Sequence, residues 1–116
     1  MYNKSKVKSI KNKGKILNLL KNGKVFNTKN LKFHYIQENN LDSQIEYLIS
    51  IPKKNIKLAV TRNYLKRIIR NIISSKKNRL TELRTKTIFI IVFINNCKIK
   101  YSKLEKEILT FLRRIE

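Results

Sequence analysis

Positive side chains recur along one stretch of the sequence at a spacing that could bind phosphate groups. Arg62, Lys66 and Arg70 follow one another at intervals of four residues, and Asn63 and Arg67 lie beside them. Residues four apart lie on one side of a helix, so a helix here would present these groups together. Arg can hold a phosphate through two hydrogen bonds, Lys adds a point charge, and Asn can donate and accept. This combination predicts contact with the phosphate backbone of a nucleic acid.

A basic helix side can also be merely solvated, and the charge of the whole chain bears on that alternative. Solvated basic sides usually carry Glu for ion pairs, but no Asp or Glu occurs between Lys53 and Arg79. The 116 residues include 28 Lys and Arg against 7 Asp and Glu, a net charge of +21. AT-rich codons would favour Lys, Asn and Ile, but they would also favour Glu. Because Glu is scarce, such a codon bias does not explain the positive charge. The charge therefore indicates a polyanionic partner, with nucleic acid preferred over a membrane surface.

Side chains for catalysis or metal binding are sparse in the sequence. No two of the seven acidic residues form an evident pair for acid–base catalysis. The only histidine, His34, has no companions for a zinc site, and its simpler interpretation is a surface or packing residue. The only cysteine, Cys97, can form no internal disulfide, and neither a Gly-rich phosphate loop nor a nucleophile motif occurs. We therefore expect no catalytic residues and no metal ligands in the protein itself.

Two helices are predicted near the ends of the chain. The first covers residues 12–22, where Asn12 can cap the start and Gly23 is expected to end the helix in the left-handed conformation. The last follows Ser102 and Glu105, which match the S-x-x-E capping box. Apolar residues at helical spacing give each helix a side to bury: Ile16, Leu19 and Leu20 in the first, and Leu104, Ile108, Phe111, Leu112 and Ile115 in the last.

A central helix and several strands complete the predicted fold. The helical period covers residues 59–76, residues 31–37 and 45–51 alternate as strands do, and the apolar run 87–93 predicts a buried strand. We expect the strands before the central helix to pair as a hairpin of two or three strands. The strand at 31–37 has two different faces: Leu31, Phe33 and Tyr35 on one, and Lys32, His34 and Ile36 on the other. The order α-β-β-β-α-β-α predicts an α+β fold, a compact α/β sandwich in one domain over residues 1–116.

The sequence offers no membrane-spanning or export signal. The longest apolar run, residues 88–94, is too short to cross a bilayer. The basic residues at the start lack the apolar stretch of a secretory signal. We therefore expect a cytoplasmic protein with no membrane partner.

The basic stretch also resembles the signature of a known family. The protein subunit of bacterial ribonuclease P carries a signature that begins R-N-R and ends K-R-x-x-R, which "RNYLKRIIR" at 62–70 resembles. The strand and Lys-Lys turn that precede this signature in the family resemble "ISIPKKN", and the family's first helix and its stop resemble "IKNKGKILNLLKNGKVF". The resemblance implies that the central helix joins two parallel strands by a left-handed crossover, although right-handed crossovers are the rule.

Residues that contact the catalytic RNA subunit are implied by the same resemblance. They are Arg62, Asn63, Tyr64, Lys66, Arg67 and Arg70, and Arg62 would also lie near the substrate. Tyr64 departs from the family, which usually has Arg at this position. The departure removes a phosphate contact, for which stacking on a base or sugar could substitute.

A second set of residues is implied to bind the single-stranded 5′ leader of precursor tRNA, in a cleft between the first helix, the sheet and the central helix. This set comprises Ile16, Leu20, Lys32, His34, Ser50, Lys53 and Lys54. The family commonly has Phe at the positions of Ile16 and Leu20, so these residues offer apolar contact without a ring for stacking. We expect weaker leader binding as a result, unless both residues only pack the core.

The function implied by the resemblance is that of the protein component of ribonuclease P, a ribonucleoprotein endoribonuclease that removes the 5′ leader from precursor tRNA. Its RNA subunit and Mg²⁺ ions would hydrolyse the phosphodiester bond, one protein would bind one RNA, and the protein alone would be inactive. From the residues alone, a small basic ribosomal or RNA-packaging protein is the main alternative. A helix-dependent DNA binder is the other, although the sequence shows no helix-turn-helix partner for the basic helix.

Overall fold

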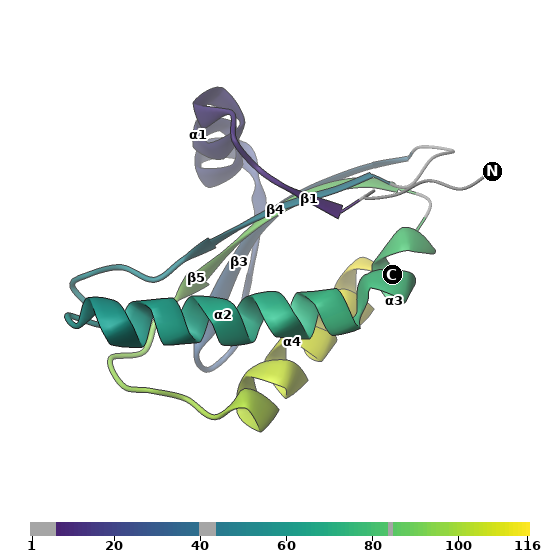
Figure 1. Cartoon of the computed structure of the whole chain (residues 1–116). Helices are drawn as coiled ribbons and strands as arrows, with labels where there is room; N and C mark the ends of the chain where they lie inside the picture. Colours follow the sequence, from purple (N-terminus) through teal and green to yellow (C-terminus); the bar gives the residue numbers. More distant parts are fainter. Residues whose placement is uncertain (1–6, 40–43, 84) are drawn as a thin grey trace.

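The computed structural model describes residues 7–39, 44–83 and 85–116. Residues 1–6, which belong to the basic start of the sequence for which no secretory signal was predicted, lie outside these ranges. Within them the chain forms a five-stranded sheet and four helices (Figure 1). The strands are β1 (Val7–Ser9), β2 (Lys24–Asn27), β3 (Leu31–Asn39), β4 (Gln44–Ser50) and β5 (Thr85–Phe93). The helices are α1 (Lys13–Asn22), α2 (Ala59–Ser75), α3 (Lys77–Thr81) and α4 (Tyr101–Ile115). The predicted α+β order is confirmed, with β1 and α3 added to it.

The strands are arranged in the order β1-β4-β5-β3-β2. β5 lies between β4, to which it is parallel, and β3, to which it is antiparallel. The predicted pairing of β3 with β4 is therefore wrong, and the antiparallel hairpin is formed by β2 and β3. The apolar β5 takes the central place because both of its faces are covered and both of its edges are hydrogen-bonded there. The chain passes from β4 to β5 through α2 and α3, and the left-handed sense of this crossover stays a prediction.

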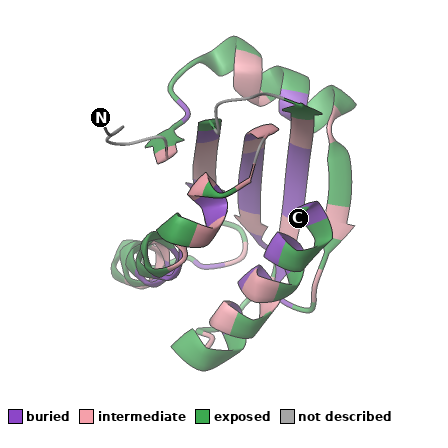
Figure 2. Ribbon diagram, turned by 90° about the vertical axis from the view of Figure 1, so that its right-hand side faces the viewer, coloured by how far each residue is buried: buried purple, intermediate pink, exposed green. Residues whose placement is uncertain are grey.

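Helices cover the two faces of the sheet unequally. α2 and α4 lie against one face, called the lower face here, and α1 lies against the other, the upper face (Figure 1). Figure 2 shows buried residues along the strands and on the inner sides of the helices. The upper face consists of Lys32, His34 and Ile36 in β3, Ile88, Ile90 and Val92 in β5, and Glu46, Leu48 and Ser50 in β4.

Aromatic rings fill the centre of the core below the sheet. Phe111 of α4 stacks on Phe33 of β3, with ring centroids 4.1 Å apart, and lies 5.3 Å from the ring of Phe89 in β5. All three side chains are almost fully buried. The predicted apolar face of β3 and the predicted stripes of α2 and α4 meet in this core. Since burying a ring removes a large apolar area from water, this side of the sheet supplies most of the hydrophobic stabilisation.

A polar network ties the turn before β3 to α4. The buried Asn30 donates its backbone N–H to Glu107 Oε1 at 2.8 Å, and its side-chain amide donates to the other carboxylate oxygen. Thr28 donates a short hydrogen bond to the same carboxylate, and Asn95 donates to the Asn30 side chain at 2.6 Å. Because every strong donor here meets an acceptor, the network holds the start of β3 in a fixed position.

The predicted left-handed end of the first helix is wrong. Gly23 has φ −72° and ψ 157°, an extended conformation open to any residue. Glycine is needed there for space, because a Cβ would lie 2.5 Å from the carbonyl oxygen of Leu19 and 3.3 Å from that of Tyr35. Asn12 caps the start of α1 as predicted, since its side chain accepts a hydrogen bond from the Lys15 N–H.

The predicted capping box of the last helix is also wrong. α4 already begins at Tyr101, and the residue before it, Lys100, makes no side-chain cap. Ser102 therefore lies inside the first turn, where its side chain cannot cap the helix. Glu105 instead forms an ion pair with Lys76 at the end of α2, with Nζ and Oε2 3.3 Å apart. The acidic side chain thus joins two helices where the sequence suggested that it closed one.

Candidate nucleic-acid interface

α2 has one buried side and one basic side, as its apolar period predicts. Its buried residues are Leu65, Ile68, Ile69, Ile72 and Ile73. Of the basic-side residues, Asn63, Arg67 and Arg70 are exposed and Arg62 and Lys66 are half-buried. Within the described residues no carboxylate pairs with these cations, since the ion pairs involve Lys15, Lys76 and Arg79. The positive charges on the basic side of α2 are therefore not neutralised by carboxylates of the described residues.

Arg62 fastens the loop that leads into α2. Its Nη1 donates to the carbonyl oxygens of Ile56 at 3.0 Å and Lys57 at 2.8 Å. The same loop is closed by a turn at Pro52, whose carbonyl oxygen accepts from the Asn55 N–H at 3.0 Å. The Asn55 side chain donates to the carbonyl oxygen of Phe93 at the end of β5. Lys53 and Lys54 thus project, both exposed, from a loop held at several points.

Two rows of side chains cross the part of the upper face next to this loop. In the first row Ser50 of β4 lies opposite Val92 of β5, and Val92 lies opposite Lys32 of β3. In the next row Ile90 lies between Leu48 and His34 in the same way. Lys32, His34 and Ser50 therefore share one patch, because alternate residues of neighbouring strands point to the same side.

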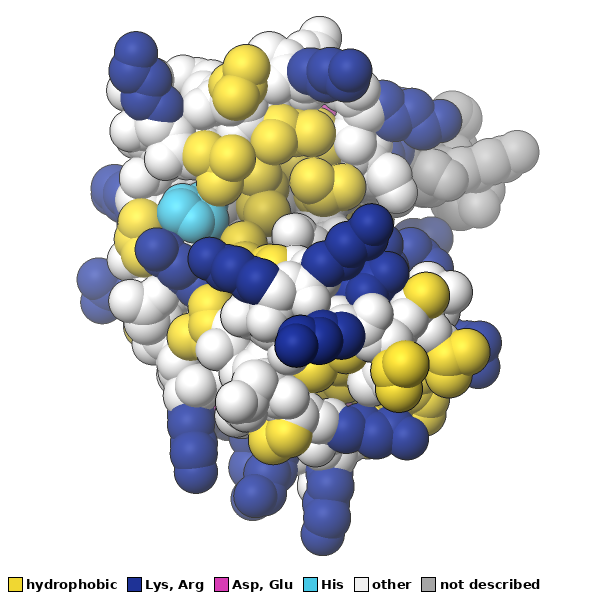
Figure 3. Space-filling view, turned by 90° about the vertical axis from the view of Figure 1, so that its left-hand side faces the viewer, with side chains coloured by type: hydrophobic (Ala, Val, Ile, Leu, Met, Phe, Trp, Pro, Cys, Tyr) yellow, Lys and Arg dark blue, Asp and Glu magenta, His cyan; other side chains and the backbone are white. Residues whose placement is uncertain are grey.

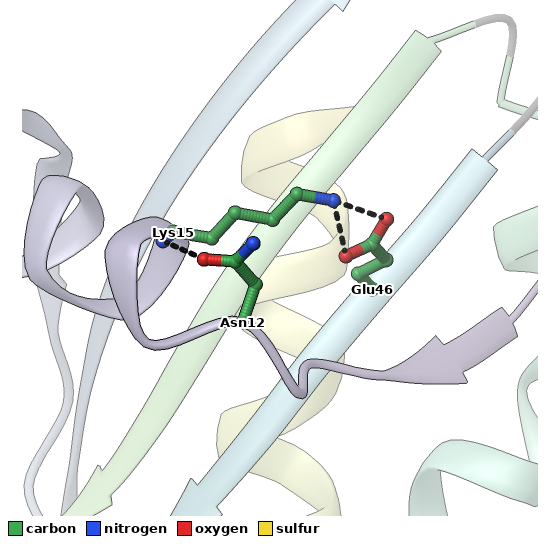
Figure 4. A network of polar contacts seen from close by, with 3 residues as sticks. All are labelled: Asn12, Lys15 and Glu46. Carbon is green, nitrogen blue, oxygen red and sulfur yellow. Dashed lines mark hydrogen bonds and ion pairs between the residues drawn. The ribbon is translucent and has the colours of Figure 1, made fainter.

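α1 crosses the upper face and is held there by few contacts. Leu19 is buried against Ile90, with Ile16 partly buried beside it. Lys15 donates to both carboxylate oxygens of Glu46 in β4 at 3.1 Å (Figure 4). This ion pair fixes one side of α1 to the sheet and neutralises a carboxylate of the upper face.

Ile16 and Leu20 lie on the flank of α1 turned away from Lys15, since successive helical residues are about 100° apart. Leu20 is 47% exposed, whereas Ile16 belongs partly to the small apolar cluster under α1. Figure 3 shows apolar side chains gathered beside the cyan imidazole of the histidine, with Lys and Arg around them and hardly any acidic side chain on this face. The interpretation that both residues only pack the core therefore applies to Ile16 in part and does not apply to Leu20.

His34 is buried on the upper face, in agreement with its interpretation as a packing residue. Its Nδ1 atom is buried and has no hydrogen-bond partner. Burial, and secondly the positive charge of Lys32, lower the pKa of the imidazole below its ordinary value of 6.5. The side chain is consequently neutral at pH 7. Because Nδ1 is enclosed, this nitrogen cannot meet a ligand at the surface of the upper face.

The position of Tyr64 differs from that of the five basic-side residues. The ring lies on the flank of α2 opposite Arg62 and Lys66, and Lys98 Nζ lies 4.2 Å from its centroid. Lys98 belongs to the loop between β5 and α4, far along the sequence from α2. No sequence pattern connects the two residues, so the sequence could not predict this contact.

A family model described as Ribonuclease P matches residues 5–116 of the chain. The chain belongs to the ribonuclease P protein family. As a member, it is a ribonuclease P protein component, part of a ribonucleoprotein of tRNA processing and associated with the ribonuclease P RNA. The ribosomal-protein and DNA-binding alternatives are thereby set aside.

Solved structures of ribonuclease P proteins have the same fold. The Staphylococcus aureus protein aligns with a TM-score of 0.73 at 21% identity, over 91% of this chain and 93% of that one. A mutant of it with defective mRNA degradation activity aligns at 0.74 and 19%, over 91% and 86%. The Thermotoga maritima protein aligns at 0.71 and 21%, over 87% and 91%. No curated protein is similar enough to the chain to count as a match.

The residues for which the ribonuclease P resemblance implies leader binding come from three adjoining elements. Ile16 and Leu20 lie on α1, Lys53 and Lys54 lie on the loop after β4, and the other three, Lys32, His34 and Ser50, lie on the upper face. The ion pair of Lys15 with Glu46, which anchors α1, was not predicted, because the spacing of the two residues along the chain follows no pattern.

Neither a membrane-spanning helix nor a metal cluster is found in the parts of the chain that the structure describes. None of the helices there has the length and hydropathy needed to cross a bilayer. Over the same residues, no three His, Cys, Asp or Glu side chains come together in a way that could hold a metal ion.

Proposed function

We propose that this ribonuclease P protein binds its RNA subunit through the basic side of α2 and holds the 5′ leader of precursor tRNA on the upper face beside α1. The RNA subunit and its Mg²⁺ ions cleave the phosphodiester bond, one protein binds one RNA, and the protein alone has no cleavage activity. The observation that carries the proposal is the basic side of α2, whose cations pair with no carboxylate of the described residues, together with an apolar patch of the upper face that Lys and Arg surround (Figure 3). A protein with this surface supplies binding and charge neutralisation, while Mg²⁺ held by the RNA supplies activation of the nucleophile.

The contact with the RNA subunit is electrostatic in the first place. Arg67 and Arg70 present exposed guanidinium groups that can each bind a phosphate through two hydrogen bonds, and Lys66 adds a charge beside them. Arg62 is held by the loop, so its remaining N–H groups point from a fixed position. Each neutralised phosphate should contribute about −0.7 to −0.9 to the slope of log K against log salt.

The contact with the leader combines apolar and charged groups. The exposed Leu20 and the partly exposed Val92 offer apolar area to bases, and Lys32 lies in the same row as Val92. Lys53 and Lys54 can follow the phosphates of an extended single strand, as in other grooves for single-stranded nucleic acid. Such a surface holds a leader without reading much of its sequence.

The proposed function is tested by cleavage of a precursor tRNA by a bacterial ribonuclease P RNA at low Mg²⁺, with and without the protein. We expect the protein to switch on cleavage that the RNA alone does not sustain under these conditions. Binding to the RNA without any gain in cleavage would overturn the proposal.

A charge-matched pair of variants tests the role of α2. Arg67→Ala removes one exposed guanidinium group from the basic side of α2, and Arg113→Ala removes one from an exposed position on α4. Loss of a charged hydrogen bond costs about 1.5–3 kcal/mol, so we expect Arg67→Ala to weaken binding to the RNA at least tenfold. Arg113→Ala should leave the affinity nearly unchanged. Equal losses in the two variants would show that only net charge matters, and would move the RNA contact away from α2.

A further inference from the structure

A second cluster of positive charge lies on the other flank of α2, around a surface pocket of ≈ 570 Å³. The pocket is lined by the loop before α2, by Thr61 in its first turn and by the loop between β5 and α4. Three of the lining residues are lysines, Lys54, Lys57 and Lys98, and none of the described residues that line it is acidic. No carboxylate pairs with these lysines in the described ranges. Three lysines that line one hollow make its electrostatic potential positive, which favours an anion there.

Tyr64 holds one of these lysines in place. The ammonium group of Lys98 lies over the ring at 4.2 Å from its centroid, while the ring remains 38% exposed. A cation over the face of a tyrosine is attracted by the ring quadrupole, and at an exposed site the attraction is modest. Lys98 is therefore oriented by the ring and still open to solvent on its other side. The ring thus puts a positive charge at the helix position where the family signature has Arg.

The surroundings of the pocket fit a nucleotide chain better than a free anion. Leu58 in the pocket wall is 70% exposed, and Val60 and Ile94 nearby in sequence are 80% and 41% exposed. Exposed apolar area beside positive charge suits a ligand that carries sugars and bases as well as phosphates. The hydroxyl of Thr61 and the amide of Asn96 add hydrogen-bonding groups to the lining.

We propose that this pocket binds a backbone phosphate of the catalytic RNA subunit, with Lys98 as the phosphate ligand and Tyr64 as the residue that positions it. The proposal rests on the proposed function and extends the RNA contact around the N-terminal half of α2 to its opposite flank. Arg67 on the basic side and Lys98 on the opposite flank, both exposed, could then contact different phosphates of the same RNA and hold it from two directions.

The test compares affinities of the full-length protein for a bacterial ribonuclease P RNA over a series of salt concentrations. We expect Lys98→Gln to weaken binding about threefold to tenfold and to reduce the salt slope by about 0.7–0.9, the value for one phosphate. Lys103→Gln, the same charge change at an exposed position of α4 outside the pocket, is the control and should change little. Equal effects of the two variants would overturn the proposal.

Tyr64 variants separate positioning from direct contact. Tyr64→Phe keeps the ring and should keep the affinity, whereas Tyr64→Leu should weaken binding about twofold to fivefold. Because Tyr64 acts through Lys98, the double variant Tyr64→Leu with Lys98→Gln should bind no more weakly than Lys98→Gln alone. Additive losses would show that the ring contacts the RNA itself and would overturn the positioning role.

Two further comparisons show whether the phosphate comes from the RNA subunit or from the leader, and which of the two proposals fails. A loss by Lys98→Gln that appears only with precursor tRNA carrying a leader, and not with the RNA subunit, would assign the pocket to the leader and overturn this proposal. If Arg67→Ala weakens RNA binding while Lys98→Gln does not, the pocket proposal fails and the proposed function stands. If neither variant changes binding and the protein fails to stimulate cleavage, the proposed function fails as well.

Discussion

In the part of the chain that the structure describes, two helices cover the lower face of the sheet and one helix, α1, crosses the upper face (Figure 1). Below the sheet, Phe33, Phe89 and Phe111 interlock in a core without solvent access. Above it, the buried set consists of Ile10, Leu19 and Ile90, and its neighbours are only partly buried. One face thus uses apolar side chains to hold the molecule together, and the other keeps some of them available to a ligand.

The largest effect on the difference between the two faces is expected at Phe111, the ring in the middle of the core below the sheet. Phe111→Ala removes contacts with several rings and leaves a cavity, so we expect the free energy of unfolding to fall by about 3–5 kcal/mol. Urea unfolding followed by circular dichroism measures this loss. Leu20→Ala, on the exposed flank of α1, should cost less than about 1 kcal/mol. Similar losses in both variants would mean that the two faces contribute equally to stability.

The role of the upper face in leader binding can be tested by adding an aromatic side chain to α1. Leu20→Phe adds a stacking surface at a position that is 47% exposed, where no core can be overpacked. Stacking on one base contributes about 1–3 kcal/mol, so we expect precursor tRNA with a leader to bind about tenfold more tightly. Leu17→Phe, on α1 at 67% exposure, is the control and should have no such effect. The affinity for tRNA without a leader should stay constant, and a gain there would argue against leader contact.

A smaller effect is expected from the ion pair between α1 and the sheet. Glu46→Gln removes the partner of Lys15 and should lower the free energy of unfolding by about 0.2–1 kcal/mol, since both groups are partly exposed and screened. The freed lysine should then bind phosphate, so the affinity for the leader should rise. Glu105→Gln breaks the pair with Lys76 on the other side of the molecule. This control should lower stability similarly without changing leader affinity, and a matching rise in leader affinity would contradict a role of Lys15.

The smallest effect concerns His34 and the pH dependence of stability. The pKa of His34 is lowered in the folded protein, first by burial and then by Lys32, so the unfolded chain binds a proton more readily. Stability is therefore complete above the ordinary pKa of 6.5 and falls as the pH drops below it toward the folded pKa. We expect His34→Leu to lose less stability than the parent between about pH 7.5 and pH 5.5 in urea unfolding. Parallel losses in the two proteins would exclude this contribution.

Much of the fold follows from periodicity, but the pairing of strands does not. Alternation assigned Phe33 to the core and His34 to the opposite face, and both assignments are confirmed. Alternation predicts which face of the sheet a residue lies on, but it does not predict which strands are neighbours. The position of β5 between β3 and β4 was therefore not predicted. β1 and α3 are too short to show a period. Gly23 was misjudged because its constraint is the close approach of two carbonyl oxygens, one in the last turn of α1 and the other in β3.

The site shows the same division. The basic side of α2 was predictable because its residues lie within three helical turns and their spacing fixes their direction. The contacts of Lys98 with Tyr64 and of Lys15 with Glu46 join segments that only the folded chain brings together. Their side chains gave no local signal, so pairs of this kind are where a structure adds to sequence interpretation.

The central strand of the sheet is also the last one in the chain. A ribosome delivers β3 and β4 first, and each must wait with an open hydrogen-bonding edge until residues 85–93 emerge. The hairpin of β2 and β3 can form early, but most of the sheet depends on contacts between distant segments, which slows folding. The surface proposed for the leader draws on β3, β4 and β5 together. It therefore cannot form on a growing chain until residues 85–93 have been synthesised and have paired with β3 and β4.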